Sequence, residues 1–376
     1  MINKKILIFH SSNDLYGASK IFLQILNLLK NKSFELHVML PCKGKLDDLI
    51  HEDINVSYFN FGVLRKKYLN IFGIFNRLVK IFKAFFLIRN YISKNKIDLV
   101  YTNTSVIWAS GMAARSLKIP SIYHVHEIPF GSFLYEKLSG YLLNSISTKV
   151  ICVSDAVFSY WGINIDNLKL VRTYNGIEIP KVLKKQTNDD EILISNISRI
   201  TPYKGHKYLI EVFKNLIFLE QKFKLFIIGD VYPGNEHYLE ELKSLVEKYK
   251  LVENIRFLGY KRDVYKILSK SNLFIHTPIN QDPLPTVLFE SLYSKTPTIS
   301  TNIGGALEIL NNGNNGLLIP INDSTKSANL IYNYYKNIDK QKQHLKNSEL
   351  FLKKNFSSKK FYKNILNIIT KSFDDQ

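Results

Sequence analysis

Two basic residues, Arg199 and Lys204, stand five positions apart just beyond an apolar run, Ile192–Ile197, that reads as a buried strand. A turn containing Pro202 and Gly205 shapes this stretch, and a helical pattern follows it. Two cations beside the start of a helix suit a diphosphate, because point charges and free backbone N–H groups both attract phosphate oxygens. Taken alone, the pair could equally be two solvated surface cations.

A second candidate segment runs from Asp282 to Glu290. Pro285 favours the first turn of a helix, which leaves the backbone N–H groups of Thr286 and Val287 available to an anion or a hydroxyl. The two carboxylates could accept hydrogen bonds from a sugar and a ribose. They could also be a glycosidase pair, which needs roughly 5 to 9.5 Å between its carboxyl groups, or simply a helix cap and a surface glutamate.

The elements that must position these residues are short apolar runs that alternate with amphipathic helical patterns. This alternation indicates parallel sheets with helices on both faces. The predicted strands are Ile6–Phe9, Glu35–Leu40, Val56–Phe59, Leu99–Tyr101, Ser121–Val125, Val150–Val153, Lys169–Val171, Ile192–Ile197, Lys224–Ile228, Ile255–Phe257, Leu273–Ile275 and Thr298–Ser300. The predicted helices include Ser19–Lys30, Tyr68–Ser93, Tyr208–Leu219, Tyr238–Tyr249 and Val287–Tyr293.

The pattern is interrupted over residues 178–190, a polar stretch that resembles an exposed linker. We therefore predict an N-terminal domain over residues 1–177, a C-terminal domain over 191–355, and a last helix over 356–376 that packs back on the first domain. Both domains are expected to be doubly wound, Rossmann-like α/β units that face each other across a cleft. Ligands of such open sheets bind outside the carboxyl ends of the strands, where both candidate segments fall.

Composition excludes several classes of protein. At 45% hydrophobic residues, the 376-residue chain can bury two ordinary cores. Its cysteines, Cys42 and Cys152, make neither a disulfide framework nor a zinc site, which favours a reducing cytoplasm. We find no apolar stretch long enough to span a bilayer. A cytoplasmic protein, either soluble or peripheral on the inner face of the membrane, is therefore expected.

The formal net charge of +19 calls for an anionic partner or reflects a lysine-rich composition. Residues 65–96 stand out, because no acidic residue occurs between Asp53 and Asp98. This segment holds nine cations: Arg65, Lys66, Lys67, Arg77, Lys80, Lys83, Arg89, Lys94 and Lys96. Interleaved with Phe and Ile, they suit an anionic membrane surface. A helix as apolar as this segment is more often part of a core. It could both pack in a core and bind a membrane if one flank packs inward. A nucleic-acid-binding protein is supported only by the net charge.

Further motifs follow the two candidate segments in a fixed order. They are Asp14–Ser19, His124–Glu127, Val153–Ala156, Tyr174–Ile177, Ile227–Asp230, Phe257–Tyr260 and Ser300–Gly305. With these motifs the chain resembles the retaining glycosyltransferases of family 4, which have the GT-B fold. The resemblance covers nearly the whole chain. Each motif is weak singly, and their order and spacing together are specific.

The resemblance implies roles for residues of the second half, which would be the nucleotide-sugar-binding domain. Arg199 and Lys204 match the cationic pair that holds the donor's diphosphate and stabilises it as it leaves. Glu290 matches the acid that binds the nucleotide ribose, and Thr286 and Val287 match the backbone contacts beside it.

The same resemblance assigns the remaining donor contacts. Asp282 stands where the family usually carries a glutamate that binds the hydroxyls of the donor sugar, and its shorter side chain reaches less far. Phe257 and Leu258 match the segment whose backbone lies against the nucleobase.

In the first half, the acceptor-side domain, Gly17 and Ala18 match a loop that approaches the phosphates and the acceptor, where small side chains permit close approach. His126 matches a histidine near the reacting sugar. A metal site at His124, His126 and Glu127 is not expected, because alternate residues of a strand share a face and Glu127 then points away. Neither a metal nor another cofactor is implied.

The implied reaction moves a sugar from a nucleoside-diphosphate donor to a glycan or lipid-linked acceptor with retention of configuration. The implied mechanism is front-face attack, in which the leaving phosphate takes the acceptor's proton. The implied setting is bacterial surface-polysaccharide biosynthesis: O-antigen or lipopolysaccharide, capsule or exopolysaccharide. The alternative with the same fold is a sugar-nucleotide 2-epimerase, which needs no acceptor.

Overall fold

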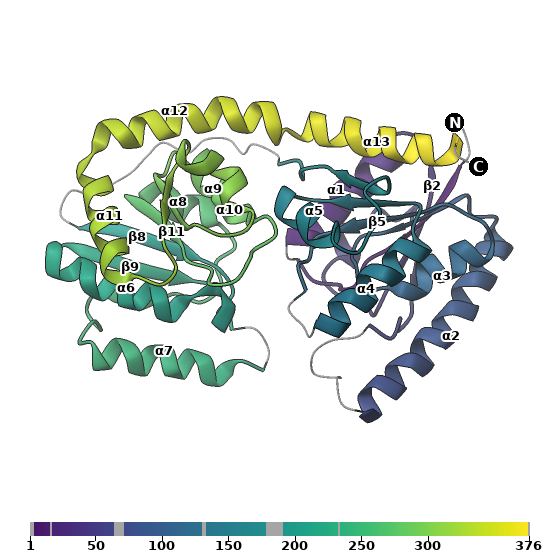
Figure 1. Cartoon of the computed structure of the whole chain (residues 1–376), viewed down its shortest axis with the longest axis horizontal. Coiled ribbons are helices and arrows are strands. Elements are labelled where there is room, and N and C mark those ends of the chain that lie inside the picture. Colours follow the sequence, from purple (N-terminus) through teal and green to yellow (C-terminus); the bar gives the residue numbers. More distant parts are fainter. Residues whose placement is uncertain are drawn as a thin grey trace. The chain divides into compact units, whose positions relative to one another are not determined.

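The computed structural model describes residues 4–15, 17–63, 71–129, 133–177, 191–231 and 234–374. The predicted linker over residues 178–190 lies outside the described residues, as do Arg65, Lys66 and Lys67 of the basic segment. The chain divides into two compact units. Unit 1 comprises Met1–Gly176 and Ser358–Gln376, and unit 2 comprises Ile177–Ser357 (Figure 1).

Unit 1 is built on a seven-stranded parallel sheet with the order β3-β2-β1-β4-β5-β6-β7. Its strands are β1 (Lys5–Phe9), β2 (Glu35–Leu40), β3 (Asn55–Tyr58), β4 (Leu99–Thr102), β5 (Ser121–Val125), β6 (Lys149–Cys152) and β7 (Leu170–Arg172). Its helices are α1 (Gly17–Lys30), α2 (Ile71–Asn95), α3 (Trp108–Ser116), α4 (Phe133–Ile146), α5 (Asp155–Trp161), α13 (Ser358–Asp374) and the short 3₁₀ turn η1 (Asp47–Leu49). The strand order reverses at β1, which is the mark of a doubly wound fold.

Unit 2 repeats this plan with six parallel strands in the order β10-β9-β8-β11-β12-β13. The strands are β8 (Ile192–Ile197), β9 (Phe223–Ile228), β10 (Ile255–Phe257), β11 (Leu273–His276), β12 (Thr298–Thr301) and β13 (Leu317–Ile319). The helices are α6 (His206–Leu219), α7 (Glu236–Lys248), α8 (Val264–Lys270), α9 (Thr286–Tyr293), α10 (Ala306–Ile309), α11 (Ser324–Lys336) and α12 (Ile338–Asn355), with 3₁₀ turns η3 (Pro202–Lys204) and η4 (Asn311–Gly313). The predicted class, two doubly wound Rossmann-like α/β domains, is confirmed.

Both sheets are covered on their two faces, so their central strands are buried on both sides. The side chains of Ile6, Leu7, Ile8 and Phe9 in β1 are all fully buried. This is why the strands read as continuous apolar runs and not as alternating ones.

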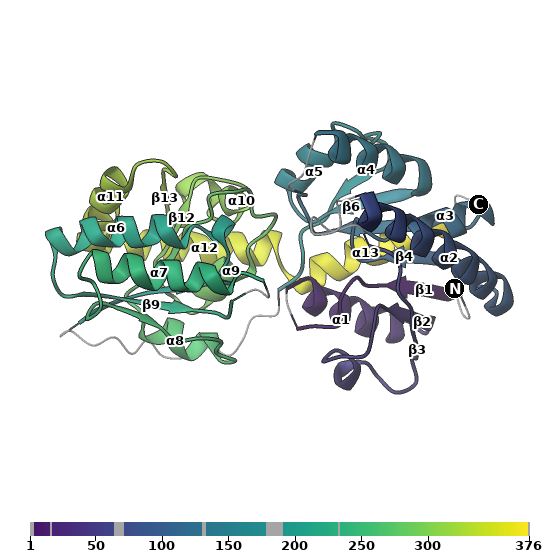
Figure 2. The same ribbon diagram turned by 90° about the horizontal axis from the view of Figure 1, so that it is seen from below.

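Helix α13 belongs to unit 1 although it is the last element of the chain. Phe361, Ile365 and Ile369 recur at helical spacing and enter the core of unit 1, and α13 lies beside α1 (Figures 1 and 2). The last helix therefore supplies apolar surface that the preceding sheet needs.

Helix α2 packs inward along one narrow stripe only. Ile81, Ala84, Ile88 and Ile92 are buried, and α2 contacts α3. The rest of the helix surface carries exposed phenylalanines. One flank of α2 thus packs inward, as a core helix does, and the other flank is exposed.

The contribution of α13 can be measured with Phe361→Ala. Removing a fully buried phenylalanine leaves a cavity, so the variant should lose about 3–5 kcal/mol of unfolding free energy in a denaturant titration. Lys363→Ala, at an exposed position of the same helix, should stay within about 0.5 kcal/mol of the parent. Equal stability of the two variants would show that α13 is dispensable for unit 1.

Candidate functional site

Lys204 is positioned by a tight contact between its loop and the end of β11. The next residue, Gly205, has φ 71°, and a Cβ there would lie 1.8 Å from the Thr277 carbonyl oxygen. Only glycine permits this approach. The turn η3 and the start of α6 are thereby pressed against the carboxyl end of β11.

The Lys204 ammonium forms an ion pair with the Asp282 carboxylate. Both side chains are largely buried, with exposed fractions of 22% and 12%. His276 Nε2 lies 3.4 Å from the same Asp282 oxygen. Burial of the Asp282 carboxyl opposes its ionisation, but the neighbouring Lys204 charge and the His276 contact prevail and hold its pKa well below the usual range. Asp282 is therefore a carboxylate at every physiological pH.

The loop that carries Asp282 is held by Gly304 and Gly305. The Gly305 N–H donates to the Asp282 carbonyl oxygen at 2.8 Å. A Cβ on Gly304 would lie 2.6 Å from that oxygen, and a Cβ on Gly305 would lie 2.2 Å from the Pro283 carbonyl oxygen. Backbone packs on backbone here, so the loop after β11 cannot shift without the loop after β12.

Helix α9 begins directly after this loop, with Pro285 at its cap position and no side-chain cap. The first-turn amides of Thr286 and Val287 have no acceptor within the helix. Glu290 is half-buried on the second turn. Burial, and then the Glu290 charge, raises the pKa of Tyr265 on α8, so the Glu290 carboxylate lies near that phenol.

The other predicted donor contacts also lie at carboxyl ends of strands. Arg199 follows β8 and is half-buried. Its loop passes close to Gly229, where a Cβ would lie 1.9 Å from the Ser198 carbonyl oxygen. Phe257 ends β10 and packs against the core of unit 2, and the Leu258 N–H donates to the Ile227 carbonyl at 2.9 Å.

In unit 1, Asn103 connects the predicted residues Ala18 and His126. Its Nδ2 donates to the Ala18 carbonyl at 3.2 Å, and its Oδ1 lies 2.9 Å from His126 Nε2. Because Oδ1 can only accept, His126 Nε2 carries the hydrogen. Burial, reinforced by His124 and His10, holds the His126 pKa well below its usual value, so the ring is neutral. Gly17 opens α1, directly before Ala18.

Glu127 is turned toward the loop after β4. It accepts hydrogen bonds from Thr104 Oγ1 at 2.5 Å, and from Ser105 N and Ser105 Oγ at 3.2 Å each. His124 instead lies within the core, with its Nδ1 2.9 Å from the Tyr101 hydroxyl. In the described part of the chain, no three His, Cys, Asp or Glu side chains are grouped so as to hold a metal ion.

Sequence reasoning missed His276, Asn103 and His10. His276 is 1% exposed, and its Nδ1 has no hydrogen-bond partner among the described residues. His10 follows β1, with its Nε2 3.0 Å from Ser19 Oγ. A signal was present, since His10 and His276 are each the first polar residue after an apolar strand run and Asn103 is the second, but such residues are also common caps and turns.

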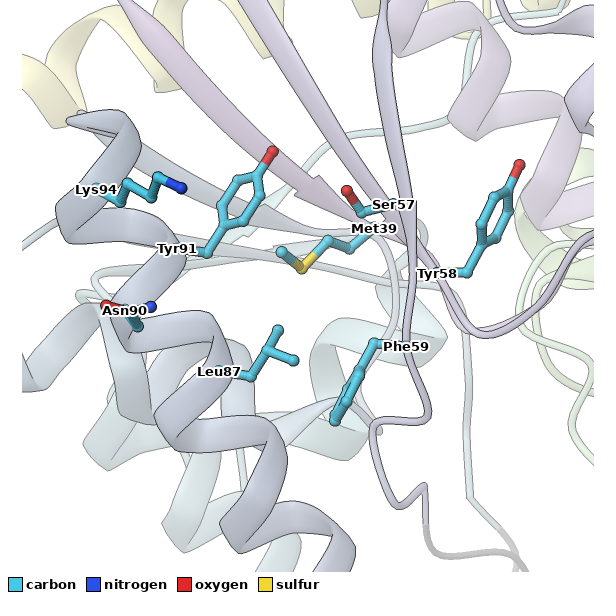
Figure 3. Close-up of a pocket in the computed structure, with 8 residues that line it drawn as sticks. All are labelled: Met39, Ser57, Tyr58, Phe59, Leu87, Asn90, Tyr91 and Lys94. Atoms are coloured by element: carbon cyan, nitrogen blue, oxygen red, sulfur yellow. The ribbon is translucent and has the colours of Figure 1, made fainter.

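A pocket of about 330 Å³ lies elsewhere in unit 1, between α2 and strands β2 and β3 (Figure 3). Met39, Phe59, Leu87 and Tyr91 point toward its interior, whereas Tyr58 points away. It includes none of the residues predicted to contact the donor or the acceptor, but Lys94 of the basic segment lines it.

Two protein-family models match the sequence of this chain. The model described as "Glycosyltransferase Family 4" matches residues 16–180, and "Glycosyl transferases group 1" matches residues 179–350. The chain thus belongs to the family 4 glycosyltransferases of GT-B fold, and it is an enzyme of the glycosyltransferase class.

Individual relatives agree with this assignment. The Escherichia coli UDP-Gal:alpha-D-GlcNAc-diphosphoundecaprenol alpha-1,3-galactosyltransferase is 25% identical over 343 residues, which cover 84% of each chain. Among solved structures, HepE of Anabaena in complex with UDP and glucose has a TM-score of 0.80 at 21% identity, covering 98% of this chain and 99% of HepE. A glycosyltransferase from Rickettsia africae has a TM-score of 0.81 at 22% identity and covers both chains fully.

The buried histidines make the structure acid-sensitive. Burial lowers the pKa of His206, which is fully buried, from 6.5 to about 4. Between these two pKa values the histidine is protonated in the unfolded chain and neutral in the folded one. The contribution of His206 to the free energy of unfolding is therefore fully present above pH 6.5 and is lost as the pH drops toward 4. The loss for this residue is about 3 kcal/mol. Denaturant titrations of the transition that includes unit 2 should show this slope, and His206→Gln should flatten it. An unchanged slope in that variant would exclude His206 as the source.

Proposed function

We propose that this protein transfers a sugar from a nucleoside-diphosphate donor, with uridine as the favoured base, to a lipid-linked glycan acceptor. The Lys204–Asp282 pair, placed beside the start of α9, is the observation on which this function rests. A cation and a carboxylate fixed together at the carboxyl end of a parallel sheet suit a ligand that combines phosphates with hydroxyls. The E. coli relative is described as using UDP-Gal, and HepE was solved with UDP and glucose.

Lys204 holds the leaving diphosphate in this proposal. An ammonium has three N–H donors, and one of them is used by Asp282, which leaves two for phosphate oxygens. Because the Asp282 charge offsets that of Lys204, further positive potential has to come from Arg199 and from the first-turn amides of α9. Cations that are fixed before the reaction stabilise the charge that grows on the phosphate without reorganising.

Asp282 and Glu290 bind hydroxyls. Asp282 stays ionised although buried, and its remaining lone pairs can accept hydrogen bonds from the donor sugar. The buried ring of His276 lies beside it, with Nε2 3.4 Å from the Asp282 carboxylate and with no partner for Nδ1 among the described residues. It provides a neutral polar group that fits the same sugar. Glu290, one helical turn beyond the α9 amides of Thr286 and Val287, takes the ribose.

On the acceptor side, Gly17 and Ala18 present backbone and little side chain. Burial keeps His126 neutral, and the Asn103 side chain orients its ring. Retention follows if the acceptor hydroxyl attacks C1 of the sugar from the side of the leaving group. The bond from C1 to the phosphate oxygen breaks, the bond from C1 to the acceptor oxygen forms, and the departing phosphate takes the hydroxyl proton. No protein nucleophile is needed for this step.

The same comparison supports the proposed acceptor class and setting. The E. coli relative acts on a sugar attached to diphosphoundecaprenol, as its name states. We therefore place this enzyme in surface-polysaccharide biosynthesis, attached peripherally to an anionic cytoplasmic membrane face through residues 65–96. No helix of the described residues is long and apolar enough to cross a membrane.

The phosphate role is tested by Lys204→Gln. The amide keeps a hydrogen bond to Asp282 but removes the charge, so turnover should fall at least about a hundredfold. Release of UDP from a UDP-sugar, with and without a lipid-linked acceptor, measures this effect. Thermal melts serve as the folding control, because an unpaired buried Asp282 would destabilise unit 2. Near-normal turnover would remove Lys204 from the site, and conversion of the donor without an acceptor would indicate an epimerase.

The ribose role is tested by Glu290→Gln, which keeps the shape of the side chain and weakens a charge-assisted hydrogen bond. The affinity for free UDP should drop by about 1 kcal/mol or more, roughly fivefold. Isothermal titration with UDP measures it directly. Glu308→Gln, a half-buried acid in the same unit, is the matched control. If both variants bind UDP like the parent, Glu290 does not contact the nucleotide.

A further inference from the structure

Three helices, α2, α3 and α4, lie side by side on unit 1 (Figures 1 and 2). Helix α3 is the middle member and packs against both neighbours, and the rings of Trp108 on α3 and Tyr135 on α4 are 6.4 Å apart. The outer sides of α2 and α4 are therefore parts of one surface, with Met112 of α3 exposed between them.

The outer side of α2 is apolar. Phe72, Phe75, Phe82 and Phe86 have exposed fractions of 88%, 69%, 64% and 52%. Leu78 and Val79 are exposed as well. Isolated exposed apolar residues are ordinary, but a contiguous row of phenylalanines along one helix marks an interaction surface.

Helix α4 also carries a row of exposed apolar side chains. Leu134, Leu138 and Tyr141 share one helical face and are 74%, 49% and 70% exposed, and Phe133 at the helix start is 79% exposed. This face accompanies Lys137, which is also exposed. The two helices that flank α3 thus turn aromatic and aliphatic side chains to solvent.

The starts of these helices lie at the edge of the sheet that carries the site. A helix between two parallel strands runs back from the carboxyl end of one to the amino end of the next, so α2 and α4 begin near the carboxyl edge. At 25 residues α2 is about 37 Å long, about twice the length of a strand of the sheet. Its first turns, with Phe72 and Phe75, therefore project beyond this edge, where His126 and Ala18 also lie.

The charged side chains of α2, around its exposed phenylalanines, are all positive. Lys83, Arg89 and Lys94 of α2 are exposed, and α2 contains no acidic residue. Each cation near an anionic leaflet contributes about fivefold in affinity. A protein partner for such a surface would need its own acidic groups around an apolar face, whereas an anionic bilayer provides both properties at once.

We propose that the outer faces of α2 and α4 together form a membrane-insertion surface. Phe72, Phe75, Phe133 and Leu134 enter the interfacial region of an anionic bilayer, and the α2 cations bind its headgroups. This inference deepens the proposed function, since it brings the carboxyl edge of the unit 1 sheet close to the plane in which a lipid-linked acceptor is held.

The test is sedimentation with vesicles of phosphatidylcholine, with or without one third phosphatidylglycerol, at low and high salt and without nucleotide. The parent should bind the anionic vesicles, retain part of that binding at high salt, and bind the neutral vesicles weakly. Phe133→Ser with Leu134→Ser should reduce the high-salt affinity at least about tenfold, because insertion is the salt-resistant component. Lys83→Glu with Arg89→Glu should remove mainly the salt-sensitive part.

Phe218→Ser with Leu350→Ser is the matched control, since these residues of unit 2 are 80% and 69% exposed. It should bind vesicles like the parent. If the α4 variant binds as the control does, α4 does not insert. If the parent ignores anionic vesicles altogether, the surface serves a protein partner instead, and the proposal fails.

Vesicle binding and catalysis are separable readouts. UDP release with a detergent-solubilised acceptor should be unchanged in the α4 variant, whereas transfer to an acceptor embedded in vesicles should fall with its vesicle affinity. Loss of both activities to the same extent would contradict a membrane role for α4. Absence of transfer in the parent, together with normal vesicle binding, would contradict the proposed function and leave the insertion surface standing.

Discussion

The buried contact between Lys204 and Asp282 constrains the rest of unit 2. A carboxylate that is only 12% exposed requires a compensating charge, and the compensating lysine lies on a different loop. Three loops, after β8, β11 and β12, must therefore meet at one point of the sheet edge. The glycines at 205, 304 and 305 let the backbones approach closely enough to do so. Side-chain electrostatics and backbone sterics thus impose the same arrangement.

In unit 1, the loops at the carboxyl ends of the strands are held by different interactions. Hydrogen bonds take the place of the ion pair: the Asn103 amide binds His126 and the Ala18 carbonyl, and Glu127 accepts hydrogen bonds from the loop after β4. Burial keeps the histidines uncharged. The cation of the candidate site is therefore held in unit 2 by an ion pair, whereas the buried histidines at the corresponding edge of unit 1 are uncharged.

Much of the fold could be predicted from sequence, because buried parallel strands give apolar runs that differ little from their observed bounds, as at Glu35–Leu40 and Ile192–Ile197. The strand β13 (Leu317–Ile319) was missed, although β7 and β10 are equally short and were predicted. The ion pair between Lys204 and Asp282 could not be predicted from the sequence. The motifs assigned Lys204 to the diphosphate and Asp282 to the donor sugar, and gave no sign that the two side chains contact each other. The exposed row on α4 escaped notice because its period matches that of an ordinary amphipathic helix, and only the solvent exposure reveals which side faces outward.

The placement of α13 affects the order in which the molecule can be assembled. The chain leaves unit 1 after Gly176 and re-enters it at Ser358, and beside these two crossings the Ile177 N–H donates to the Phe356 carbonyl at 3.1 Å. Unit 2 is therefore an insertion within unit 1. During synthesis, unit 2 has its whole sequence available while unit 1 still lacks the side chains of Phe361, Ile365 and Ile369. A nascent chain cut short before Ser358 would therefore hold a folded unit 2 attached to a unit 1 whose core is open.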